Sequence, residues 1–261
     1  MKKLLAVLTA LVLLLAFAAL AEETLTSGDF EYRLLTNGEA EITKYDGKAD
    51  KLDIPSVLDG HKVTVIGDWA FTNCDSLISV TIPGSVTSIG ANPFCGCRKL
   101  TTLKVSPESE YLAVIDGVLF SKPDRRLVCC PRAFTQAEYS IPKGIRIIGD
   151  SAFAYCRSLT SVTIPESITN IDRSAFAKCD RLTSVTIPGS VTSIGGYAFV
   201  YCESLASVTI PASVTSIGSY AFSHCGEQLV ITVDKGSCAA DYCKENGLTY
   251  QYPDALDWLK N

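Results

Sequence analysis

The chain has 261 residues, of which 47% are hydrophobic and 20% are charged, the composition of an ordinary folded protein. Its formal net charge is −5, so it lacks the basic surplus that would neutralise phosphates, and we expect no nucleic-acid partner. The only histidines are His61 and His224, which leaves little scope for histidine-based catalysis or histidine-ligated metal sites.

Residues 1–21 have the pattern of a secretory signal peptide. Met1-Lys2-Lys3 is positively charged, residues 4–20 are almost entirely apolar, and Ala19-Leu20-Ala21 is a small-residue cleavage motif. An uncleaved membrane anchor is the alternative, since about 18 apolar residues can just cross a bilayer. The motif favours cleavage after Ala21, and we therefore expect a secreted or cell-surface protein with no membrane insertion after signal cleavage.

Residues 22–63 are predicted to form an N-terminal β cap. Two segments with strand composition, residues 30–35 and 41–45, flank the turn-forming sequence Thr36-Asn37-Gly38-Glu39. This arrangement is typical of a β-hairpin, which we expect to close one end of the structure that follows.

Residues 64–233 contain a repeat of 23 residues, each copy opening with the pattern I-[GD]-x-x-[AP]-F. The opening residues are Ile66, Ile89, Ile148, Ile171, Ile194 and Ile217. A phenylalanine and a cysteine recur at fixed offsets, at Phe71, Phe94, Phe153, Phe176, Phe199 and Phe222 and at Cys74, Cys97, Cys156, Cys179, Cys202 and Cys225. Such a register predicts a solenoid, because equivalent residues of successive coils stack in one continuous core.

Each copy has the local pattern of a coil with two extended segments. In Leu182-x-x-Val185-x-Ile187-Pro188, β-branched residues at period two predict a short strand with one buried face, which the proline ends. Residues 190–194 predict a second extended segment, and Gly195 a tight turn after it. A short helical or 3₁₀ turn then carries the phenylalanine and cysteine inward. The fold class is therefore mainly β, a solenoid of parallel strands.

One coil, about residues 108–147, is enlarged. Residues 118–120 and 127–129 are apolar and flank residues 121–126, which predicts a protruding hairpin with a basic tip. A tolerated surface insertion and a contact loop are both compatible with this pattern, since insertions in solenoids tend to project from one face.

Residues 234–261 are predicted to form a C-terminal cap and tail. Residues 229–233 have the pattern of a last strand, and Ser237 as N-cap with Gly247 after the C-cap predicts a short helix over Cys238–Asn246. Residues 248–250 can pair beyond it.

The repeated pattern I-G-x-x-A-F-x-x-C-x-x-L-x-x-V-x-I-P-x-S-V-T-S resembles the BspA-like class of bacterial leucine-rich repeats and is similar to the repeats of treponemal surface proteins. The resemblance covers roughly residues 60–233, the enlarged coil included. It implies a right-handed leucine-rich-repeat solenoid and a surface protein that binds host proteins as an adhesin, with no catalytic residues to transfer.

Eleven cysteines in an exported protein first indicate disulfides. Six of them, however, hold one repeat position beside a core phenylalanine, which predicts a ladder of buried thiols. The other five are Cys95, Cys129, Cys130, Cys238 and Cys243. They lack the paired C-x-x-C spacing and nearby histidine of a zinc site. We expect no metal, no cofactor and no enzymatic activity, since the sequence contains no nucleophile elbow, metalloprotease motif or phosphate-binding loop.

The candidate binding residues are the polar side chains that alternate with the buried ones along the first strands. They are Ser79, Thr81, Thr102, Lys104, Ser161, Thr163, Ser184, Thr186, Ser207 and Thr209. These residues predict two parallel polar files that can hydrogen-bond to an extracellular protein or glycan. A merely solubilising polar face is the alternative. A rival contact patch consists of Tyr155, Tyr197, Tyr201 and Tyr220.

The sequence thus favours a monomeric, non-enzymatic, adhesin-like binding protein, secreted or at the cell surface. A passive envelope scaffold without a dedicated ligand is the alternative.

Overall fold

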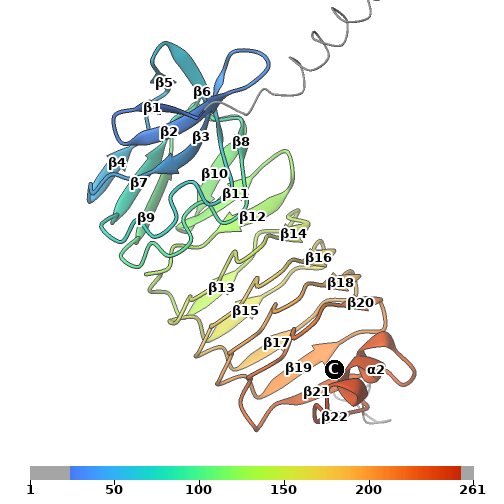
Figure 1. Cartoon of the computed structure of the whole chain (residues 1–261). Helices are drawn as coiled ribbons and strands as arrows, with labels where there is room; N and C mark the ends of the chain where they lie inside the picture. Colours follow the sequence, from blue (N-terminus) through green and yellow to red (C-terminus); the bar gives the residue numbers. More distant parts are fainter. Residues whose placement is uncertain (1–23, 254–261) are drawn as a thin grey trace, which may run out of the picture.

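The computed structural model describes residues 24–253, which form an elongated solenoid built almost entirely of short strands (Figure 1). The expected signal peptide, residues 1–21, and residues 254–261 of the expected tail lie outside the described residues. No helix within residues 24–253 has the length and apolar character needed to cross a membrane.

The predicted N-terminal hairpin is present and continues directly into the solenoid. Its sheet contains β1 (Leu25–Ser27), β2 (Phe30–Leu34), β3 (Ala40–Tyr45), β5 (Val57–Leu58), β6 (His61–Ile66) and β8 (Ser88–Ile89). Strands β2 and β3 pair antiparallel, whereas β3 pairs parallel with β6 and β6 parallel with β8. The cap therefore supplies the first backbone ladder on which the coils stack.

Each regular coil contributes two strands, as predicted. The first strands are β4 (Lys51–Asp53), β7 (Ser79–Ile82), β9 (Thr102–Val105), β13 (Glu138–Ser140), β15 (Ser161–Thr163), β17 (Ser184–Thr186), β19 (Ser207–Ile210) and β21 (Val230–Val233). The second strands beyond β8 are β14 (Ile147–Ile148), β16 (Asn170–Ile171), β18 (Ser193–Ile194) and β20 (Ser216–Ile217). Equivalent strands of neighbouring coils pair parallel and in register, for example Ser184 with Ser207 and Ile171 with Ile194.

Phenylalanine rings stacked along the solenoid form the centre of the core. Phe153, Phe176, Phe199 and Phe222 follow one another with centroid separations of 5.2, 5.1 and 5.1 Å and an interplanar angle of 5° at each step. Tyr139 lies before the first ring at 5.7 Å, and Tyr242 of the C-terminal helix meets the last one edge-on at 6.3 Å. An isolated coil would leave its phenylalanine ring exposed to water, because the ring is buried only where a neighbouring coil covers it.

The predicted thiol ladder runs beside these rings. Cys179, Cys202 and Cys225 each donate an S–H hydrogen bond to the phenylalanine carbonyl of the preceding coil, at Sγ–O distances of 3.1, 3.1 and 3.2 Å. Cys97 does the same to Phe71 at 3.0 Å. The small thiol thus fills space next to the ring and satisfies a buried acceptor, which is why one residue type recurs here.

Most second strands are followed by a glycine, with Asp172 after β16 as the exception, because neighbouring coils approach closely there. A Cβ atom at Gly195 would collide with the backbone nitrogen of Arg173, and one at Gly218 with that of Gly196. Neither glycine has a positive φ. The predicted turn therefore needs glycine because there is no room for a Cβ atom, and not because the backbone adopts a conformation that favours glycine.

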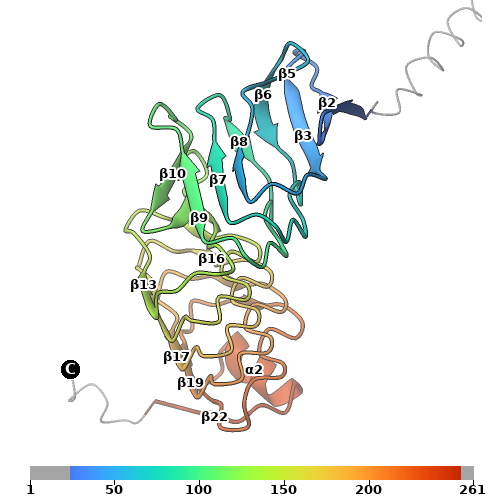
Figure 2. The ribbon, with the colours of Figure 1, turned by 90° about the vertical axis from the view of Figure 1, so that its left-hand side faces the viewer.

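The enlarged coil divides the solenoid into two stacks, which follow one another along the molecule (Figure 2). It contains β10 (Leu112–Ile115), β11 (Val118–Ser121) and β12 (Arg126–Cys129), paired antiparallel, and β12 then pairs parallel with β14. Within the described residues, β9 is the last strand of one sheet and β13 the first strand of another.

The prediction of a protruding hairpin is wrong in one respect. The hairpin exists, but every residue of β11 is buried, and only the turn at residues 122–125 is exposed. Leu119 packs in the core of the N-terminal stack, whereas Val118 and Phe120 pack in the core of the C-terminal stack. The hairpin is a wall between two cores because both of its faces are apolar.

The C-terminal cap agrees with the prediction. Helix α2 (Cys238–Glu245) begins after Ser237, whose hydroxyl accepts a hydrogen bond from the Ala240 N–H at 3.2 Å, and Gly247 follows its end with a φ of 65°. Strand β22 (Tyr250–Gln251) pairs parallel with β21. The last coil therefore has both a paired edge and a covered core.

Replacing a central ring of the stack should be costly. We expect Phe199→Ala to lower the free energy of unfolding by about 3–5 kcal/mol, since it removes a fully buried ring with a neighbour on each side. Urea denaturation measures this, with Leu34→Ala as a control, since Leu34 is 42% exposed and should change stability by less than about 0.5 kcal/mol. Equal losses in the two variants would contradict the role of the stack.

Candidate binding surfaces

The structure separates the ten predicted binding residues into two groups. Six lie on β15, β17 and β19, where their side chains are exposed and in register from one coil to the next. Within residues 24–253 the hydroxyls of these six residues have no intramolecular hydrogen-bond partner. They are Ser161, Thr163, Ser184, Thr186, Ser207 and Thr209. Their exposure agrees with the predicted alternation, and their binding to a ligand stays a prediction.

The other four residues lie on a different sheet. Ser79 and Thr81 on β7, and Thr102 on β9, are half-buried, and only Lys104 is exposed. The expected pair of continuous files is therefore wrong, because the enlarged coil interrupts the ladder between β9 and β13. The exposed hydroxyl surface is confined to the C-terminal stack.

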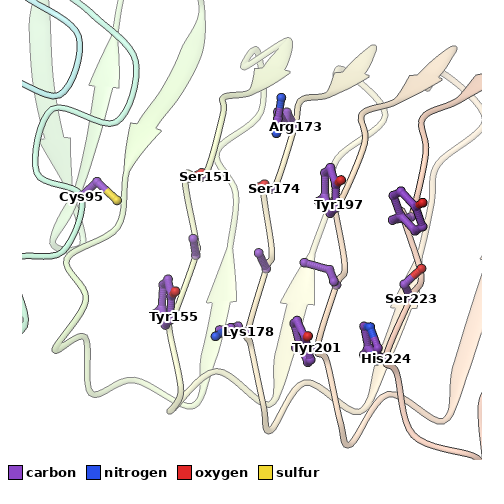
Figure 3. Close-up of a pocket in the computed structure, with 14 residues that line it drawn as sticks. Cys95, Ser151, Tyr155, Arg173, Ser174, Lys178, Tyr197, Tyr201, Ser223 and His224 are labelled. Carbon is purple, nitrogen blue, oxygen red and sulfur yellow. The ribbon is translucent and has the colours of Figure 1, made fainter.

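A groove of about 580 Å³ lies on another face of the C-terminal stack, formed by the turns that carry the core phenylalanines (Figure 3). Equivalent turn residues of four successive coils line it in three parallel rows. One row consists of Ser151, Ser174, Tyr197 and Tyr220, and the opposite row of Tyr155, Lys178, Tyr201 and His224. Between them, Ala154, Ala177, Val200 and Ser223 form the floor. The groove therefore runs along the solenoid axis.

Both rows owe their orientation to an unusual backbone. All eight of their residues have a positive φ, between 52° and 64°, although none is a glycine. The left-handed conformation costs roughly 1–2 kcal/mol per residue, and here hydrogen bonds between coils hold it. The N–H groups of Tyr197 and Tyr201 donate to the carbonyls of Ser219 and Ser223 in the next coil, both at 3.0 Å. Side chains at these positions are thus displayed outward on a rigid frame.

Rings and cations alternate along one row. The guanidinium carbon of Arg132 lies 3.9 Å from the ring centroid of Tyr155, and the Lys178 Nζ lies 5.2 Å from that ring and 5.1 Å from the ring of Tyr201. His224 then stacks on Tyr201 at 4.5 Å with an angle of 6°. These distances are those of cation–π and stacking contacts, so the row is a continuous stack.

The opposite row is also stacked. Tyr197 and Tyr220 lie 5.4 Å apart, and the Arg173 guanidinium carbon lies 5.2 Å from the Tyr197 ring. The phenolic hydroxyls of the two rows have no hydrogen-bond partner within the described part of the chain. The rings present their edges and hydroxyls to the groove, because neighbouring residues cover much of their faces.

The tyrosine patch expected from the sequence is therefore part of a groove. The structure places all four tyrosines around it together with His224. Sequence reasoning missed Lys178 and Arg173 as lining residues and Arg132 at the end of the row. The repeat spacing could have predicted this row, because four of its residues lie seven positions after the opening isoleucine of their copies. They are Tyr155, Lys178, Tyr201 and His224.

Cys225 and Cys95 are poorly suited to nucleophilic or metal chemistry. Burial raises the pKa of Cys225 to about 11 and also raises that of Cys95, which lies at the end of the groove. These thiols are protonated at neutral pH, whereas the nucleophile and metal ligand is the thiolate. Among residues 24–253, no cluster of His, Cys, Asp and Glu side chains has an arrangement that could hold a metal ion.

A coil of 23 residues, with an inward leucine, a short parallel strand and a return turn, defines a leucine-rich-repeat solenoid. The model of the BspA type leucine rich repeat region matches residues 47–122 and 131–238 in six copies. The chain belongs to this family, as the repeat pattern predicted. No curated protein sequence matches the chain significantly.

Several solved structures have a similar fold. Pneumococcal vaccine antigen PcpA is 19% identical, with 82% of this chain and 71% of that one covered and a TM-score of 0.55. A leucine-rich repeat protein from Eubacterium ventriosum is 19% identical, with coverages of 80% and 77% and a TM-score of 0.51. A leucine rich cell surface protein from Faecalibacterium prausnitzii is 22% identical, with coverages of 87% and 97% and a TM-score of 0.47. At these identities the likeness to the first two structures concerns the fold alone.

The state of the cysteines can be measured directly. We expect all eleven to titrate as thiols when the chain is unfolded without reductant. In the folded chain at pH 8, Cys225 should resist alkylation, because its pKa of about 11 leaves almost no thiolate. Mass spectrometry after alkylation counts the labelled sites. Fewer than eleven thiols in the unfolded chain would show a disulfide, and a disulfide at Cys74, Cys97, Cys156, Cys179, Cys202 or Cys225 would contradict the ladder.

Proposed function

We propose that this chain is a secreted or cell-surface, non-enzymatic protein that binds an extracellular macromolecule in the groove of its C-terminal stack. The observation that carries the proposal is the groove itself, in which rigid coils display two stacked rows of tyrosines and cations. Tyrosine and arginine are the residues that dominate binding energy at protein surfaces. Membership of a family of bacterial surface repeat proteins and the leader-like sequence of residues 1–21 support the location.

The hydroxyl surface of β15, β17 and β19 is the second candidate. Its six unpartnered hydroxyls favour it as a hydrogen-bonding platform for a protein or glycan, as the sequence predicts. The groove, by contrast, is a concave site, and buried anchors in pockets contribute more to affinity than flat polar contacts do. The covered ends of the solenoid, formed by the N-terminal cap and α2, favour a monomer that binds along its length.

Paired variants separate the two surfaces. We expect the purified chain to bind a member of an array of extracellular-matrix proteins, host glycans and envelope polymers. Tyr197→Ser with Tyr201→Ser should reduce that binding by about tenfold or more, because it removes one ring from each row. The control Tyr111→Ser with Tyr252→Ser also removes two exposed tyrosines, outside the groove, and should leave binding unchanged.

The variant Thr163→Lys with Thr186→Lys tests the strand surface in the same array. Binding that survives it but not the groove variant supports the proposal. Binding that is lost only with the lysine variant transfers the function to the strand surface. No binding by the native chain across the array would favour the alternative of an envelope scaffold without a ligand.

A further inference from the structure

We infer that the groove takes a linear anionic glycan, a sugar chain bearing carboxylate or sulfate groups, laid along the solenoid axis. This inference rests on the proposed function, since it names the ligand class of the same groove. Charge, spacing and the free polar groups of the two rows carry it.

The groove is positively charged in a protein of net charge −5. Its lining includes Arg173 and Lys178 but no aspartate or glutamate. Within residues 24–253 neither of these cations, nor Arg132 at the end of the row, has an ion-pair partner. Arg157, by contrast, lies near the same turns and is paired with Asp180 at 3.1 Å. The groove therefore keeps cations that no acidic side chain neutralises.

The contacts of these cations leave their donors free. Tyrosine rings, rather than carboxylates, hold Lys178 and Arg132 in place. An ammonium has three N–H donors and a guanidinium five, and a guanidinium stacked over a ring still presents its edge to a carboxylate or sulfate. Asp150 and Asp172 share a second depression with Arg173 on the neighbouring face, without an ion pair to it. Lys178 and Arg132 are thus the principal anion-binding groups.

The repeat of the groove distinguishes a glycan from a peptide. Neighbouring coils are about 4.8 Å apart, so each row offers one side chain at that interval. A sugar ring in an extended chain advances by a similar length, and each ring can meet one coil. An extended peptide places side chains on one side about every 6.6 Å, twice its rise per residue. Its side chains therefore do not match the spacing of about 4.8 Å between residues of a row.

The remaining groups of the groove suit sugar rings. Four tyrosine hydroxyls and those of Ser174 and Ser223 have no intramolecular partner in the part of the chain that the structure describes, so they can bind sugar hydroxyls. Ala154, Ala177 and Val200 give the floor an apolar strip for the C–H face of a ring. An amphipathic, repetitive and charged ligand matches all three rows at once.

Defined polymers test the inference with the purified chain. Polygalacturonate supplies carboxylates and dextran sulfate supplies sulfates on a sugar chain, while dextran is the neutral glycan and polyglutamate the acidic peptide. We expect one or both anionic glycans to bind at least about tenfold more tightly than dextran and polyglutamate. Raising the salt from about 50 mM to about 0.5 M should weaken that binding, because exposed charges are screened.

Charge-matched variants place the binding in the groove. Lys178→Gln and Lys143→Gln each remove one positive charge, but Lys143 is exposed in a loop outside the groove. We expect Lys178→Gln, and likewise Arg132→Gln, to weaken binding by about fivefold or more and Lys143→Gln by less than about twofold. Circular dichroism checks that each variant is folded.

Several results would overturn the inference. Equal binding of dextran excludes recognition of charge, preferential binding of polyglutamate makes the ligand an acidic peptide, and equal effects of Lys178→Gln and Lys143→Gln place the binding outside the groove. If no polymer binds while the array above still yields a ligand that depends on Tyr197 and Tyr201, the glycan inference fails and the proposed function stands. If neither the polymers nor the array yields a ligand, both the glycan inference and the proposed function are wrong.

Discussion

The backbone hydrogen bonds between equivalent strands of neighbouring coils are the interaction on which the rest of this structure depends. They hold the coils about 4.8 Å apart and place each side chain over its equivalent in the next copy, as with Ser184 and Ser207. A phenylalanine ring in one coil must then stack on one in the next, and the centroid separations of 5.1–5.2 Å follow from the ladder. The thiols depend on it too, because Cys179, Cys202 and Cys225 find their acceptors in the preceding coil.

The same register sets the positions of the surface side chains but does not determine which residue types occupy them. At the two left-handed positions of each turn the side chain points outward, so a serine at Ser174 and a tyrosine at Tyr197 are equally compatible with the coil. Core positions are therefore uniform along the chain, whereas the surface rows vary from coil to coil. That freedom lets the stack present rings next to cations, and hence a groove with its own chemistry, at no cost to the core.

The enlarged coil limits where a ligand can lie. Its strand β11 has apolar residues on both faces and separates the two cores, while Arg126 donates a hydrogen bond at 2.8 Å to the carbonyl of Ile89 on the other side of the division. The strand surface is interrupted there. Apart from Cys95 at its end, the groove is built from the C-terminal stack alone. One irregular coil thus decides the extent of both candidate surfaces.

The sequence by itself determined the repeat length, the buried side chains, the caps and the family, because each depends on a local period or a short motif such as Ser237 before α2. It also contained the four tyrosines. Only the tertiary structure decided that Tyr155, Lys178, Tyr201 and His224 form one stack with Arg132, and that β9 and β13 belong to different sheets. The physical reason is that a period specifies which face a residue occupies. The path of the enlarged coil through the core, by contrast, depends on contacts between segments that no period relates.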